Sequence, residues 1–129
     1  MQIGFYEEFP SKDNLEKLKL IKFRTRIFIA AKSLSEFREY EQLVKNYKKN
    51  LEIGYWPIIP NSYWISPFSN TGDLEKLFIE LERIENPLLI DLEFPLKNKS
   101  IFLKNLFSFC ELPRAKAHSV FDAKKLIVM

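Results

Sequence analysis

Four short apolar segments recur along the chain, and amphipathic patterns separate them. The apolar segments are rich in β-branched and aromatic residues and nearly continuous in hydrophobicity; they lie at residues 2–6, 26–31, 51–56 and 88–92. Runs of this kind are typical of strands covered on both faces, as in parallel sheets. Because strand and helix patterns alternate, the sequence predicts βαβ units with right-handed crossovers.

Helical periodicity fills the gaps between these segments. We expect helices at residues 13–21, with Asp13 as N-cap, and from Ser33 to about residue 47, where Ser33 and Glu36 have the spacing of a capping box. Further helices are expected from Thr71 or Asp73 onward and at residues 99–110. Residues 1–110 are thus predicted to hold four βα units. Residues 111–129 form a basic tail whose last six residues contain a candidate fifth strand.

Chain length limits how far such a sheet can close. A complete (β/α)8 barrel needs about 250 residues, whereas this chain has 129. The predicted fold is therefore α/β, with parallel repeats that form half of a (β/α)8 (TIM) barrel or a barrel-like open sheet. Such a sheet has two unpaired edges. A homodimer that closes the barrel, an open sheet and a chain shortened relative to its relatives all fit.

Composition excludes several classes of protein. One Cys and one His allow neither a disulfide framework nor a Cys/His zinc cluster, and three glycines allow no Walker A loop or dinucleotide fingerprint. The chain has no apolar run of 18 residues and no secretion signal at its start, so we expect a cytoplasmic protein with no membrane segment. The net charge of +3 does not indicate a nucleic-acid partner.

Candidate functional residues gather where the predicted strands end. In parallel α/β folds the loops and helix N-termini meet at the carboxyl ends of the strands, and chemistry collects there. Carboxylates surrounded by aromatic rings suit a sugar, since rings stack on its apolar face and acids act on its oxygens. The residues at these positions, together with two from the long loop 57–72, are Glu7, Glu8, Lys32, Tyr55, Trp56, Tyr63, Trp64, Asp91 and Glu93.

Asp91 and Glu93 are the most informative pair. Two residues apart on a strand, they point to the same side. If that side is the barrel interior, the two carboxylates compete for one space and one pKa rises, which makes a general acid available near neutral pH. The same two acids, with Glu7 or Glu8, could instead bind Mg²⁺ through oxygen ligands.

The segment Asn86–Glu93, which reads N-P-L-L-I-D-L-E, resembles the fourth-strand signature D-G-x-D-x-D-x-E of the glycoside hydrolase family 18 chitinases. The resemblance implies that Glu93 is the general acid and that Asp91 orients the acetamido group of the substrate. Asn86, Pro87 and Leu89 stand where the family has an acid, a glycine and a second acid. Over a longer span, the chain is similar to the N-terminal half of TIM-barrel enzymes.

These observations favour a carbohydrate-active hydrolase. Glu93 is its predicted acid, Asp91 assists, and Glu7 and Glu8 are secondary carboxylates; a small-molecule or carbohydrate ligand would contact the remaining strand-end residues. No resident metal or cofactor is required, although Mg²⁺ fits the acids. The alternatives are a non-catalytic half-barrel that dimerises or binds a partner, and a Mg²⁺-dependent phosphodiesterase or lyase.

Overall fold

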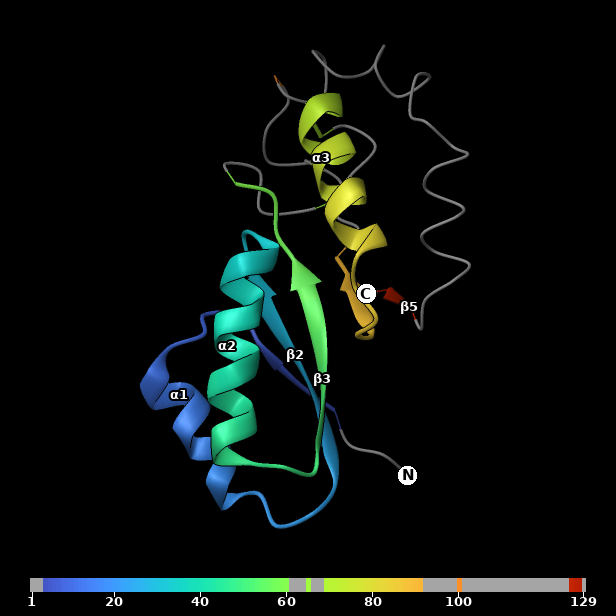
Figure 1. Cartoon of the computed structure of the whole chain (residues 1–129). Helices are drawn as coiled ribbons and strands as arrows, with labels where there is room; N and C mark the ends of the chain where they lie inside the picture. Colours follow the sequence, from blue (N-terminus) through green and yellow to red (C-terminus); the bar gives the residue numbers. More distant parts are fainter. Residues whose placement is uncertain (1–3, 61–64, 66–68, 92–99, 101–125, 129) are drawn as a thin grey trace.

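The computed structural model describes residues 4–60, 65, 69–91, 100 and 126–128 of the chain. Strands and helices alternate along it (Figure 1). In chain order they are β1 (Gly4–Glu7), α1 (Lys12–Glu16), the 3-10 helix η1 (Lys17–Leu20), β2 (Thr25–Ala31), α2 (Leu34–Tyr47), β3 (Leu51–Pro57), α3 (Thr71–Glu82), β4 (Leu88–Ile90) and β5 (Leu126–Val128).

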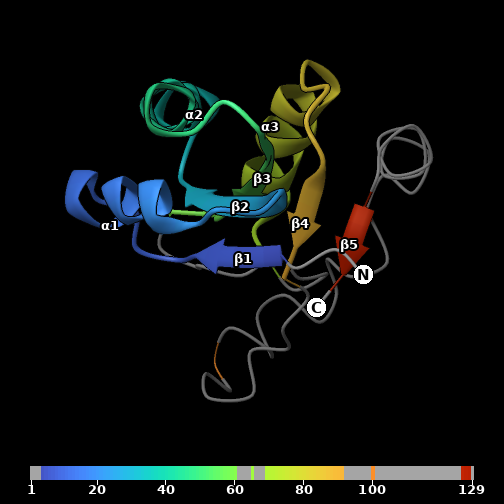
Figure 2. The same cartoon turned by 90° about the horizontal axis from the view of Figure 1, so that it is seen from below.

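All five strands form one sheet in the order β1-β2-β3-β4-β5, and every neighbouring pair is parallel. The sheet curls, and α1, α2 and α3 all lie on its outer side (Figure 2). This arrangement confirms the predicted α/β half-barrel with parallel βα repeats. The fifth strand falls within the last six residues, where a fifth strand was predicted.

The helix boundaries follow their capping residues. Helix α2 begins after Ser33, whose hydroxyl accepts the Glu36 N–H at 3.2 Å, while the Glu36 carboxylate accepts the Lys32 N–H at 2.7 Å. The prediction that Asp13 is the N-cap is wrong. The N-cap of α1 is Ser11, whose hydroxyl accepts the N–H of Asn14 at 3.1 Å, so the helix begins before Asp13. The expected helix at 99–110 and the tail at 111–125 lie outside the described residues, apart from Ser100.

Strands β2, β3 and β4 are almost wholly buried, and their residues alternate between two apolar clusters. The larger cluster lies between the sheet and the helices, where Phe37 and Val44 of α2 and Leu74, Leu77, Phe78 and Leu81 of α3 pack on Ile27, Ile29, Ile53, Tyr55, Leu88 and Ile90. We call this side the helix-covered face. The predicted pattern of strands covered on both faces is thereby explained, since a second cluster lies on the opposite side.

That opposite side, the concave face, is defined by Phe28, Ala30, Trp56 and Leu89. Tyr6 of β1 stacks on Phe28, with ring centroids 6.0 Å apart. The Phe28 ring in turn lies across Gly54 of β3, where an added Cβ would approach its Cδ1 to 2.3 Å. Glycine is therefore required at this position by the close approach of an aromatic ring rather than by backbone conformation.

Candidate functional site

Asp91 lies at the carboxyl end of the sheet, directly after β4. It is half-buried and lies two residues beyond Leu89 of the concave face, the position at which an extended chain would return a side chain to that face. Its backbone carbonyl accepts a hydrogen bond from the N–H of Ile65 at 3.2 Å. Ile65 is itself buried, so this contact fixes Ile65 beside the end of β4. One residue of the 57–72 loop and the backbone of a strand-end acid are thus neighbours.

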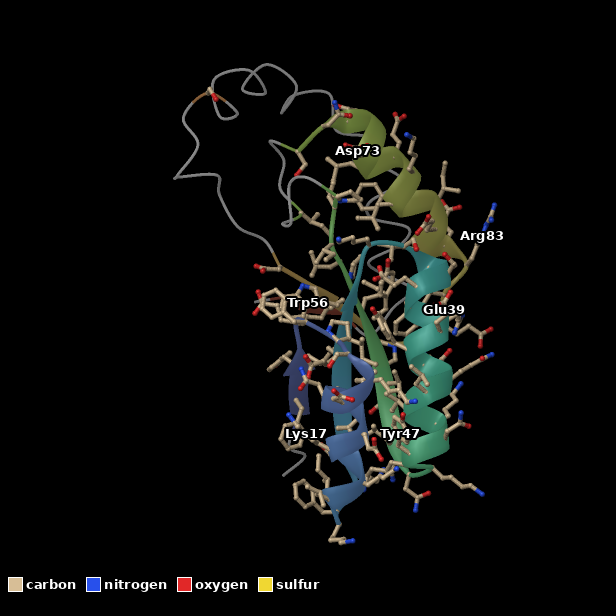
Figure 3. All side chains as sticks on the ribbon, turned by 90° about the vertical axis from the view of Figure 1, so that its left-hand side faces the viewer. Lys17, Glu39, Tyr47, Trp56, Asp73 and Arg83 are labelled. Atoms are coloured by element: carbon tan, nitrogen blue, oxygen red, sulfur yellow. The ribbon has the colours of Figure 1, made fainter. Side chains whose placement is uncertain are left out.

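Trp56 is the aromatic residue that shares this face. Its side chain lies on the opposite side of the sheet from α2 (Figure 3) and packs in one cluster with Leu89. Only 5% of Trp56 is exposed, and its indole Nε1 has no hydrogen-bond partner among the described residues. A buried N–H without an acceptor costs free energy, which makes Trp56 a donor that an acceptor atom on this face would satisfy.

Tyr55 does not belong to this group, which corrects the prediction that it forms a stacking platform with Trp56. The two are adjacent on β3 and therefore point to opposite faces. Tyr55 is fully buried on the helix-covered face, where its ring stacks on Phe37 with centroids 4.7 Å apart. Its hydroxyl donates to the Ala31 carbonyl at 3.5 Å, and burial raises the pKa of this phenol above its ordinary value.

Glu7 also lies away from the concave face. It is two residues from Phe5, which packs on the helix-side core, and it pairs in register with the core residue Ile29. Its carboxylate accepts the N–H of Phe9 at 3.3 Å. The expectation that Glu7 joins the strand-end acids in one cavity is therefore wrong, because alternation along β1 directs it outward.

Glu8 is exposed just beyond β1. Two strands separate β1 from β4, so their backbones are about 14 Å apart along the sheet at about 4.8 Å for each step. Glycosidases need carboxyl groups within about 5–9.5 Å of each other. The pairing of Asp91 with Glu93 stays a prediction. Glu93, like Tyr63 and Trp64, lies outside the described residues.

Lys32 follows β2 and lines a separate cavity of about 230 Å³. The other walls come from the loop after β3 and from α3, including Asp73 at its first turn, labelled in Figure 3, with Lys76 and Glu80. Glu80 also accepts the N–H of Leu34 at 3.1 Å, which joins α3 to the start of α2. Lys32 therefore shares this cavity with one lysine and two acids of α3.

A polar cluster that was not predicted from the sequence lies at the other end of the sheet. Glu41 of α2 is 6% exposed, and it contacts Arg38 at 2.7 Å, Lys45 at 3.0 Å and Asn86 at 3.0 Å. Asn86 also donates to the carbonyl of Ile53 at 3.0 Å. The sequence does contain an indication of this cluster, because an acid, Glu41, lies in the apolar stripe of α2 between Phe37 and Val44.

Burial by itself raises the pKa of Glu41, but hydrogen bonds from Asn86, Arg38 and Lys45 outweigh it and hold that pKa below the ordinary value. Asn86 precedes β4, so the cluster fixes the chain where β4 begins. Asn86 therefore has a structural role in this cluster.

Within the described ranges, no three His, Cys, Asp or Glu side chains are grouped so that they could hold a metal ion. A Mg²⁺ site that includes Glu93 stays a prediction, since that residue is not among them. In the same part of the chain, no helix combines the length and apolarity needed to cross a bilayer.

Fold and site together define a parallel α/β half-barrel with an acidic residue and a buried tryptophan at the carboxyl end of its concave face. Comparisons with models of known families, with curated proteins and with solved structures give no match.

Proposed function

We propose that this protein is a carboxylate-dependent hydrolase that acts on a glycosidic bond at the carboxyl end of its sheet. The observation that supports the proposal is the position of Asp91, which follows buried strand β4 directly, two residues after Leu89 of the concave face that Trp56 shares. In parallel α/β folds this end of the strands is where ligands bind.

Glu93 supplies the proton to the leaving oxygen in this proposal. An extended chain separates residues i and i+2 by about 6.6 Å, which suits the spacing of two carboxyl groups around a glycosidic bond. Asp91 orients the substrate, and Trp56, buried beside Leu89, forms part of the apolar floor beneath the site. The resemblance of residues 86–93 to the family 18 chitinases implies an N-acetylated sugar as substrate. The reaction needs no metal, and a cytoplasmic location belongs to the same proposal.

The test is hydrolysis of chromogenic glycosides by the full chain, beginning with N-acetylglucosamine oligomers. We expect Glu93→Gln to abolish turnover and Asp91→Asn to lower kcat by about 10²-fold or more, the scale of a lost acid or orienting group. Glu7→Gln is the matched control, because Glu7 is an acid at a strand end that lies on the other face. Unchanged turnover by Glu93→Gln would remove this residue from the mechanism.

A second candidate function rests on the sheet edges. Strands β1 and β5 end the sheet, and Tyr6 of β1 is 52% exposed beside the concave face. We propose as the alternative that a second copy or another protein covers these edges without catalysis. Sedimentation at several concentrations tests the homodimer: a mass of twice 15.4 kDa supports it, and a monomer at all concentrations contradicts it. Thermal stabilisation by Mg²⁺ would instead favour the metal-dependent phosphodiesterase or lyase.

A further inference from the structure

A cavity of about 840 Å³ lies at the amino end of the sheet, opposite the Asp91 site. Two loops form most of its wall, one between η1 and β2 and one between α2 and β3, and both lie at the lower end of the molecule in Figure 1. The first residues of β2 and β3 complete it. The residues that line it are Lys22, Phe23, Arg24, Arg26, Lys48, Lys49, Asn50, Leu51 and Glu52.

The charges in this cavity are strongly unequal. Five of the lining residues are Lys or Arg and one is an acid. That acid, Glu52, already forms an ion pair with Arg26, whose Nη2 and Nε atoms lie 2.6 and 2.8 Å from one oxygen of the Glu52 carboxylate. Lys48 donates to a neutral acceptor, the Ile21 carbonyl, at 2.5 Å, which joins the two loops. No acid in the described part of the chain forms an ion pair with Lys48.

The other three cations, Lys22, Arg24 and Lys49, are exposed. Among the residues that the structure describes, no acid forms an ion pair with any of them. Cations held close together by short loops repel one another, and an anion bound between them relieves that repulsion. The cavity therefore favours a ligand that carries more than one negative charge.

The adjacent cavity of about 610 Å³ shows that this imbalance is local. It is lined by three bases, Arg38, Lys45 and Arg83, and three acids, Glu41, Glu52 and Glu85. Two of those bases are paired with Glu41. Two cavities at the same end of the sheet thus differ in charge, and the larger one is the positive one.

Phe23 gives the positive cavity an exposed aromatic ring beside its charges. Its ring lines the positive cavity, is 48% exposed, and is held from one side by Phe5 at a centroid distance of 6.5 Å. An exposed ring among cations is the arrangement that binds a flat base and its phosphates together. A volume of 840 Å³ lies within the usual range of about 300–1,000 Å³ for small-molecule sites.

We propose that this cavity binds a nucleoside phosphate, with the phosphates between Lys22, Arg24 and Lys49 and the base on Phe23. The site lies at the opposite end of the sheet from Asp91 and does not depend on the hydrolase proposal. The same phosphate chemistry is presented by a free nucleotide and by a short nucleic-acid strand, so the experiment includes both.

Isothermal titration of the full chain with ATP, AMP, adenosine and inorganic triphosphate at low salt tests the proposal. We expect affinity to rise from adenosine to AMP to ATP, and to fall at least tenfold for ATP in the triple variant Lys22→Gln/Arg24→Gln/Lys49→Gln. The matched control is Lys12→Gln/Lys17→Gln/Lys76→Gln, which removes the same charge from outside the cavity and should retain affinity. Phe23→Leu should weaken ATP several-fold and leave triphosphate unchanged.

Equal weakening of ATP by the two triple variants would overturn the site, since it would show attraction by net charge alone. Equal affinities for ATP and adenosine would also overturn the site, and so would the absence of binding by every phosphate compound tested. A five-nucleotide RNA that binds at least tenfold more tightly than ATP, with the same loss in the cavity variant, would identify a strand as the source of the phosphates. If the RNA binds no more tightly than ATP, the ligand is identified as a free nucleotide.

Discussion

The two faces of the sheet are built differently. On the helix-covered face, residues from β2, β3 and β4 enter one continuous apolar cluster with α2 and α3. Among the described residues, the cluster on the concave face is smaller and is flanked by polar groups, with the Arg26–Glu52 ion pair toward the amino end and Asp91 beyond the end of β4. The contrast assigns most of the fold's stability to the first face and places the groups suited to binding on the second.

The largest effect that would separate the two faces is expected from Phe37→Ala. Phe37 is fully buried against Tyr55, so its removal should lower the free energy of unfolding by about 3–5 kcal/mol. Tyr6→Ala on the concave face is the comparison, and it should cost less than about 1.5 kcal/mol because Tyr6 is half exposed. Urea denaturation followed by circular dichroism measures both. Similar losses would show that the two faces contribute equally.

Gly54→Ala should have the next largest effect. The new Cβ would approach Cδ1 of Phe28 to 2.3 Å, and a buried ring with little space to move should make the overpacking cost about 1–3 kcal/mol. Phe28→Leu in the same chain should recover part of that loss, which a double-mutant cycle detects as coupling. Strictly additive effects of the two substitutions would contradict the contact.

The free energy of unfolding should depend on pH through Glu41, which belongs to α2 on the helix-covered face. The pKa of Glu41 is lowered in the folded chain from the ordinary 4.5, so its contribution is fully present above that value and is lost as pH falls through the folded pKa. Glu41→Gln should therefore cost about 1–2 kcal/mol at pH 7, and the difference from the unchanged chain should shrink below pH 4.5. Urea midpoints between pH 3 and 7 measure this, and a constant difference would exclude the carboxylate as the cause.

The fold could be read from the sequence because its signals are local. The continuous apolar runs at 26–31 and 51–56 and the Ser33–Glu36 spacing each act within a few residues, and they correspond to β2, β3 and the start of α2. The predicted strand at 88–92 is shorter in the structure, ending at Ile90, because a run of apolar residues does not specify where pairing with the neighbouring strands stops.

The site was less predictable because it depends on which face a residue occupies. The sequence places Tyr55 and Trp56 together at a strand end, but only the register of β3 shows that Tyr55 enters the helix-side core. Glu7 was misplaced for the same reason. The charge of the amino-end cavity was missed because its lysines and arginines come from two loops more than 20 residues apart, and only the fold brings them together.

Trp56→Phe is expected to have the smallest effect on stability and the most selective one on binding. The indole Nε1 has no partner among the described residues, so its removal breaks no hydrogen bond seen there, and the cost should stay below about 1.5 kcal/mol for a smaller ring of similar shape. If an acceptor on a sugar satisfies that N–H, KM for the glycoside should rise several-fold while the urea midpoint changes little. A large loss of stability with unchanged KM would instead make Trp56 a core residue like Tyr55. Both faces of the sheet would then contribute to stability, and Trp56 would have no part in binding.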